Sequence, residues 1–139
     1  MASPIPICSY GNNSQAAQGV RAKLLPDYDV AHICLSLGAA ESELPALCAG
    51  ELTTEPSSGL GSNAGLPAAD RKVPRAIVFG GGVPDDEVDR VTKAVQARAP
   101  GIKPIRIQRQ EVLAAGAEGP NPDVIAKLLK EKLAAILGN

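Results

Sequence analysis

The side chains of this sequence best suited to acid–base chemistry are one histidine and two glutamates. His32 is the only histidine of the chain, and the ordinary pKa of an imidazole suits proton transfer near neutral pH. Glu51 and Glu55 belong to a polar segment, and a carboxylate at the rim of an apolar crevice can act as a base when its pKa is raised. These three residues are the candidate catalytic groups. The competing interpretation is a packed histidine with one hydrogen bond and two solvated loop acids.

Two turns could present backbone N–H groups to a ligand. Each precedes a predicted helix, whose first N–H groups have no partner inside the helix and favour an anion or a polarised oxygen. We therefore predict substrate contacts in these turns, with one further residue from the polar segment and one from the segment after the last strand. The predicted substrate-binding residues are Tyr10, Gly11, Asn12, Asn13, Ser57, Gly80, Gly81, Gly82 and Arg109. The alternative for the glycine run is a tight turn followed by a capped helix.

Phosphate-binding motifs are absent from both turns. A dinucleotide site requires G-x-G-x-x-G, and the first turn contains only Gly11. The glycine run at 80–82 is followed by Asp85 and Asp86, which would repel phosphate, and no Walker A sequence occurs. Ser57 and Ser58 lack the G-x-S-x-G pattern of a nucleophile elbow. The sequence therefore does not predict a nucleotide cofactor.

The three cysteines, Cys8, Cys34 and Cys48, have unrelated spacings and do not suggest a disulfide framework. Cys8 and Cys34 each lie in an apolar strand pattern, where cysteine acts as a small hydrophobe, with a reactive thiol as the alternative. His32 has no cysteine or carboxylate neighbour at metal-ligand spacing, so we expect no metal site. His32 and Cys34 share one face of a strand, yet that face should lie under a helix, which disfavours a catalytic pair.

Four strand-like segments alternate with helix-like segments along the chain. The strands are predicted over 4–9, 28–36, 75–79 and 102–107, and the helices over 15–25, 41–49, 86–99, 109–115 (one short turn) and 122–137. This alternation predicts right-handed crossovers and a four-stranded parallel sheet with helices on both faces. The expected strand order is 2-1-3-4, a small flavodoxin-like or half-Rossmann arrangement. Its ligand crevice would lie between the first and third strands, where the order reverses.

Residues 51–73 form a long segment rich in turn-forming residues within a single predicted α/β domain over 1–139. Ordinary connections have a median length of about 4–6 residues. Segments of this length are often lids or binding loops, so we weigh an ordered functional loop against a mobile or partner-bound one. An ordered loop would roof the predicted crevice.

Composition limits the classes of partner. The chain has 139 residues, 45% hydrophobic and 21% charged, with a formal net charge of -1 and three aromatic side chains. Nucleic-acid binding needs a basic surplus and aromatic stacking, so it is not expected. No apolar run approaches the roughly 20 residues that span a bilayer, and no signal peptide is recognisable. We expect a cytoplasmic protein that forms a homodimer through its Leu-rich last helix.

Three segments, 44–50 (LPALCAG), 56–63 (PSSGLGSN) and 79–84 (FGGGVP), resemble small α/β proteins of filamentous fungi. Some of those proteins are similar to accessory enzymes of polyketide pathways, including α-pyrone-forming proteins of the aurovertin type. The resemblance implies an acyl or polyketide substrate and a ring closure or dehydration. It transfers no catalytic residue to this chain.

Two hypotheses about function follow. The first is a small cofactor-free enzyme that lactonises an acyl or polyketide chain to an α-pyrone, with a base that removes an enol proton and donors that stabilise the oxygen. The second is a non-catalytic Rossmann-like module that binds a nucleotide or a partner, or only dimerises.

Overall fold

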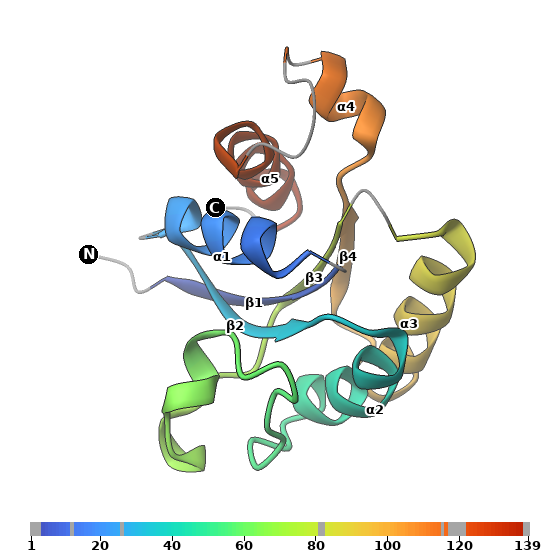
Figure 1. Ribbon diagram of the computed structural model, residues 1–139. Helices are drawn as coiled ribbons and strands as arrows, with labels where there is room; N and C mark the ends of the chain where they lie inside the picture. The colour runs from blue at the N-terminus through green and yellow to red at the C-terminus, as the bar shows by residue number, and fades with distance from the viewer. Residues whose placement is uncertain are drawn as a thin grey trace.

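Four parallel strands form the sheet of the computed structural model: β1 (Ile5–Tyr10), β2 (Tyr28–Cys34), β3 (Ala76–Phe79) and β4 (Lys103–Arg106). Their order is β2-β1-β3-β4, and each neighbouring pair is parallel (Figure 1). The predicted α/β class and strand order are therefore confirmed. The structure describes residues 4–11, 13–25, 27–80, 83–114, 116 and 122–137.

Helices cover both faces of this sheet. One face carries α1 (Ser14–Leu24) and α5 (Pro122–Leu137), and the other carries α2 (Leu37–Cys48) and α3 (Asp85–Arg98) (Figure 1). The short helix α4 (Arg109–Ala114) follows β4. Because helices bury both faces, the central strands are apolar almost throughout, as is usual for parallel sheets. None of the helices within the described ranges is long and apolar enough to cross a membrane.

Helix α2 begins four residues earlier than the sequence predicted. The hydroxyl of Ser36 caps the helix by accepting from the Ala39 backbone N–H at 3.2 Å. At the other ends of helices and strands, the predicted boundaries lie within one or two residues of those observed. Helix α2 covers β2 and carries Glu41 and Glu43 on it, as the predicted helix over 41–49 also did.

A β-bulge in β2 decides which side chains face α2. Ile7 of β1 pairs with Val30, whereas the next residue, Cys8, pairs with His32, so Ala31 is an extra residue. Val30 therefore packs beneath α1 and α5, while Cys34 packs beneath α2 and α3. The bulge thus turns His32 and Cys34 toward α2.

Residues 51–73 adopt a defined conformation along the free edge of β2. They include two short 3₁₀ helices, η1 (Ser62–Gly65) and η2 (Ala68–Asp70). The Ile33 N–H donates to the carbonyl of Leu60 at 3.3 Å, and the Ser58 hydroxyl donates to the carbonyl of Ile33 at 2.6 Å. The segment thus protects an edge strand and lies on the side of β2 away from β1, not over the crevice between β1 and β3 that an ordered loop was expected to roof.

The segment 51–73 is organised by the buried side chain of Arg71. Its guanidinium donates to the carbonyls of Leu66, Leu52 and Thr54 at 2.9–3.2 Å. The fully buried amide of Asn63 forms two 3.0 Å hydrogen bonds with the backbone of Lys72. Polar groups that would be costly to bury alone are thereby paired within the segment.

Candidate functional site

The turns after β1 and β3 meet at the carboxyl end of the sheet. The Gly80 N–H donates to the carbonyl of Tyr10 at 3.0 Å, and a Cβ on Gly11 would lie 3.8 Å from the Gly80 Cα. The structure therefore brings together three of the predicted substrate-binding residues, Tyr10, Gly11 and Gly80, where the strand order reverses. Asn12, Gly81 and Gly82 lie outside the described residues.

Tyr10 and Glu87 form a hydrogen-bonded pair at this point. The Tyr10 hydroxyl donates to Glu87 Oε1 at 2.5 Å, and the tyrosine ring lies edge-on to Phe79. Only 6% of Tyr10 is exposed, and burial, with a smaller contribution from the hydrogen bond to Glu87, raises the pKa of the phenol to about 12. The phenol thus keeps its proton at neutral pH and donates a hydrogen bond to the Glu87 side chain. Glu87 lies in the first turn of α3, where the helix dipole favours negative charge.

Two arginines near the start of α3 are occupied by protein groups. Arg90 holds both carboxylate oxygens of Glu41 at 2.9 and 3.0 Å. Arg106, at the end of β4, donates to the carbonyl of Val83 at 2.7 Å and to the carboxylate of Asp85. Because these cations already have partners, the arrangement does not favour a phosphate ligand.

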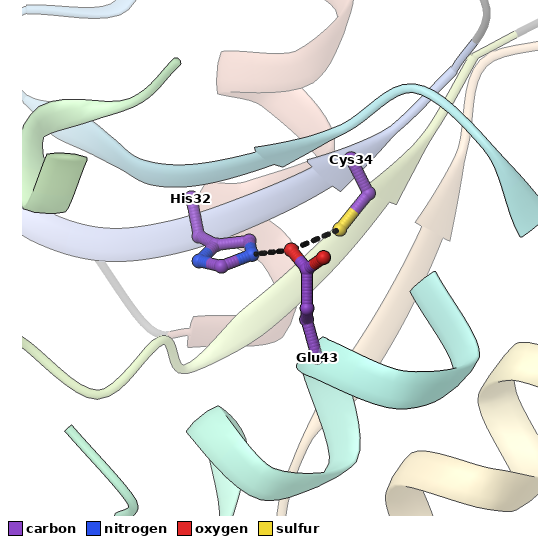
Figure 2. Close-up of side chains that lie close together, drawn as sticks. All are labelled: His32, Cys34 and Glu43. Carbon is purple, nitrogen blue, oxygen red and sulfur yellow. Dashed lines mark hydrogen bonds and ion pairs between the residues drawn. The ribbon is translucent and has the colours of Figure 1, made fainter. Parts of the chain in front are cut away.

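A second polar cluster lies deeper, between β2 and α2. His32 Nε2 lies 2.8 Å from Glu43 Oε1, and the Cys34 thiol donates to the same oxygen at 3.9 Å (Figure 2). The Ser57 backbone N–H donates to this oxygen as well, at 3.2 Å. His32 and Cys34 are fully buried, and the Glu43 side chain is 13% exposed. The premise that His32 lacks a cysteine or carboxylate neighbour is therefore wrong in three dimensions, because α2 supplies Glu43.

Burial controls the protonation of this cluster. It lowers the pKa of His32, with the positive charge of Arg71 acting in the same direction and Glu43 opposing both. Burial and the negative charge of Glu43 raise the pKa of the Cys34 thiol. At neutral pH the ring is thus neutral and the sulfur carries its proton. A protonated thiol is a poor nucleophile, which favours the packed interpretation of Cys34 over the reactive one.

The comparisons with known proteins identify one relative. The chain is 29% identical over 141 aligned residues to Kojic acid related protein 6 of Aspergillus oryzae. The alignment covers 97% of this chain and 79% of that protein. No protein-family model matches the chain, and no solved structure matches it. The similarity extends over nearly all of the sequence and agrees with the resemblance to fungal proteins seen in its motifs.

The two glutamates predicted as catalytic residues, Glu51 and Glu55, pair with arginines and not with His32. Glu51 pairs with Arg98 at the end of α3, and its side chain is 53% exposed. Glu55 lies 3.4 Å from the Arg71 guanidinium and is 78% exposed. The carboxylate that binds His32 is that of Glu43 instead. A catalytic role of Glu51 or Glu55 stays a prediction.

The remaining predicted residues have the following places. Asn13 caps α1, because its side chain accepts from the Ala16 N–H at 2.9 Å. Ser57 contributes its backbone N–H to Glu43. Arg109 begins α4, beyond the end of β4. Sequence reasoning missed Glu43 and Glu87 as site residues, because no short motif links Glu43 to His32 or Glu87 to Tyr10.

His32 should take up its second ring proton at a lower pH than a free histidine does. As the only histidine, it gives one set of ring resonances, and the midpoint of their shift should lie below the ordinary value of about 6.5. Because its pKa is lower in the folded than in the unfolded chain, the unfolded chain binds more protons. The associated stability is fully present above the unfolded pKa and is lost as pH falls through the folded pKa, with a slope of at most about 1.4 kcal/mol per pH unit.

NMR titration of the ring and chemical unfolding at several pH values check this prediction. A His32→Gln variant provides the control, since it should lose this part of the pH dependence of unfolding. A ring that titrates at or above pH 6.5 would contradict the prediction.

Proposed function

We propose that this protein is a cofactor-free enzyme of a fungal small-molecule pathway that closes an acyl or polyketide chain to an α-pyrone at the Tyr10–Glu87 pair. The observation that carries the proposal is the 2.5 Å hydrogen bond between these side chains at the switch point of the sheet. Ligands of open parallel sheets bind at this position. The name of the Aspergillus relative refers to kojic acid, which supports a role in fungal small-molecule metabolism.

The proposed reaction is the lactonisation of a 3,5-dioxo thioester through its enol. The Glu87 carboxylate removes the proton of the C5 enol hydroxyl, and the C5 oxygen attacks the thioester carbonyl carbon. A C–O bond forms, the C–S bond breaks, and the leaving thiolate takes the proton from Glu87. Positioned acid–base groups of this kind typically contribute about 10²–10⁴-fold to a rate.

Tyr10 has the complementary role of a hydrogen-bond donor. Its raised pKa keeps the hydroxyl protonated, so it can donate to the thioester oxygen as that atom becomes negative. The first turn of α3 adds the positive end of a helix dipole on the same side. Gly11 and Gly80, which have no side chains, let the two turns lie close together beside this pair.

A defined thioester tests this function. The N-acetylcysteamine thioester of 3,5-dioxohexanoic acid is incubated with the purified protein, and pyrone is quantified by chromatography and mass spectrometry against the rate in buffer. Wild-type protein should accelerate ring closure, and Tyr10→Phe should lower the rate by about 10²-fold, because one oxyanion donor is lost. Tyr28→Phe is the control. It makes the same change on the face of the sheet that α1 and α5 cover, away from Tyr10, and should retain activity.

The same experiment discriminates between the two hypotheses about function. A wild-type rate equal to that in buffer would overturn the proposed reaction for this substrate class. Thermal stabilisation by ATP or NAD⁺, without stabilisation by the thioester, would instead support the nucleotide-binding module.

A further inference from the structure

We infer that His32, Cys34 and Glu43 form a binding site for a zinc ion. The three side chains offer an imidazole nitrogen, a sulfur and a carboxylate oxygen, the ligand types that zinc prefers. Its ligands are different residues from the Tyr10–Glu87 pair, although Cys34 pairs with Tyr10 across β2 and β1, and the inference does not depend on the proposed reaction.

The geometry of the cluster is close to that of a three-ligand zinc site. The potential ligand atoms all lie within 4.8 Å of one another, with 2.8 Å between Nε2 and Oε1 and 3.9 Å between Sγ and Oε1. Ligand atoms placed about 2.0–2.3 Å from one ion are separated by less than about 4 Å. Small side-chain movements would therefore convert the hydrogen-bonded cluster into a coordinated one. Three protein ligands leave a fourth position for water or another small ligand.

The hydrogen bonding of His32 is compatible with this exchange. Its Nδ1 atom is buried and has no hydrogen-bond partner among the residues that the structure describes. With Nε2 bound to the ion, the neutral ring would carry its proton on Nδ1, where no described group donates a competing hydrogen bond. The Cys34 thiol gives up its proton to solvent when the Zn–S bond forms, so one proton is released for each ion bound.

The positions of the ligands explain what zinc would do for the fold. Figure 2 shows His32 and Cys34 projecting from β2 toward Glu43 on α2. The Ser57 N–H, from segment 51–73, contacts the same Glu43 oxygen. An ion at this point would join β2 and α2 directly and hold the long segment through Glu43. The partly exposed carboxylate of Glu43 provides the side from which the ion enters.

Metal titration of chelator-treated protein tests the inference. Isothermal titration with Zn²⁺ should show one ion bound per chain, and the melting temperature should rise with Zn²⁺ concentration. Titration with Co²⁺ should produce a thiolate-to-cobalt charge-transfer absorption. Cys34→Ala should lose that absorption, and Glu43→Gln should weaken binding at least 10-fold. Cys48→Ala is the matched control, because its thiol lies in the same core layer and is not one of the three ligands.

Three outcomes would overturn the zinc site: no stoichiometric binding by the wild-type protein, a charge-transfer band that persists in Cys34→Ala, or equal loss of the band in Cys48→Ala. Glu43→Gln keeps the test decisive if Cys34→Ala fails to fold. Pyrone formation measured in the presence of a chelator distinguishes the two proposals. A metal-free protein that still forms pyrone supports the proposed reaction, whether or not zinc binds.

Discussion

Replacement of Glu87 by glutamine should reduce the rate of pyrone formation by about 10²–10⁴-fold. The amide keeps the size of the side chain but removes the only group that this mechanism provides for taking the enol proton. The variant should fold normally, because Glu87 is only partly buried and its side chain stands in an exposed first turn. The rate with the 3,5-dioxohexanoyl thioester, measured at saturating substrate, checks the prediction.

Asp86→Asn is the matched control for this prediction. It makes the same change of charge in the same turn of α3, and its exposed side chain should leave turnover near the wild-type value. Glu51→Gln, Glu55→Gln and His32→Gln extend the series to the groups first predicted from sequence. A large rate loss in one of these three, with Glu87→Gln near wild type, would move the base away from Glu87.

Replacement of Gly61 by alanine should destabilise the protein by about 3 kcal/mol or more. Gly61 has a φ of +103°, and an added Cβ would lie 2.5 Å from the Ala31 carbonyl oxygen and 2.8 Å from the His32 nitrogen. These atoms belong to the bulged backbone of β2 and cannot move aside like a flexible side chain. Chemical unfolding should show the loss directly, and the melting temperature should fall by about 10 °C.

Two other glycines of the same segment separate the causes of that loss. Gly59 has a positive φ of 72° and open space around its Cβ position, so Gly59→Ala measures backbone strain alone. Gly65 has open space and no positive φ, and Gly65→Ala should be nearly neutral. Equal stability of Gly61→Ala and Gly65→Ala would contradict the packing of segment 51–73 on the bulge.

Local patterns predicted the secondary structure because each signal acts over a few residues. Apolar runs of strand length gave all four strands. The early start of α2 was missed because Ser36 was assigned to the preceding strand. The cytoplasmic location and the homodimer depend on other molecules and stay predictions.

The candidate sites were predicted only in part because they join residues far apart in the chain. Tyr10 and Gly80 were expected to approach each other, since parallel strands end at the same edge of a sheet. Glu87, which lies 77 residues from Tyr10, was not expected to bind it. Its side chain reaches Tyr10 because α3 packs beside α2 over β1 and β3, a relation that no short motif encodes.

The sequence by itself determined the α/β class and the strand order, because apolar periodicity and chain connectivity are local properties with few compatible topologies. Only the tertiary structure decided which carboxylate meets His32. One extra residue at Ala31 reverses the face on which the following side chains lie, and the packing of α2 then sets Glu43 against them. Strand register and helix packing are set by the whole core together, so the chemistry of this protein became visible only when the chain was folded.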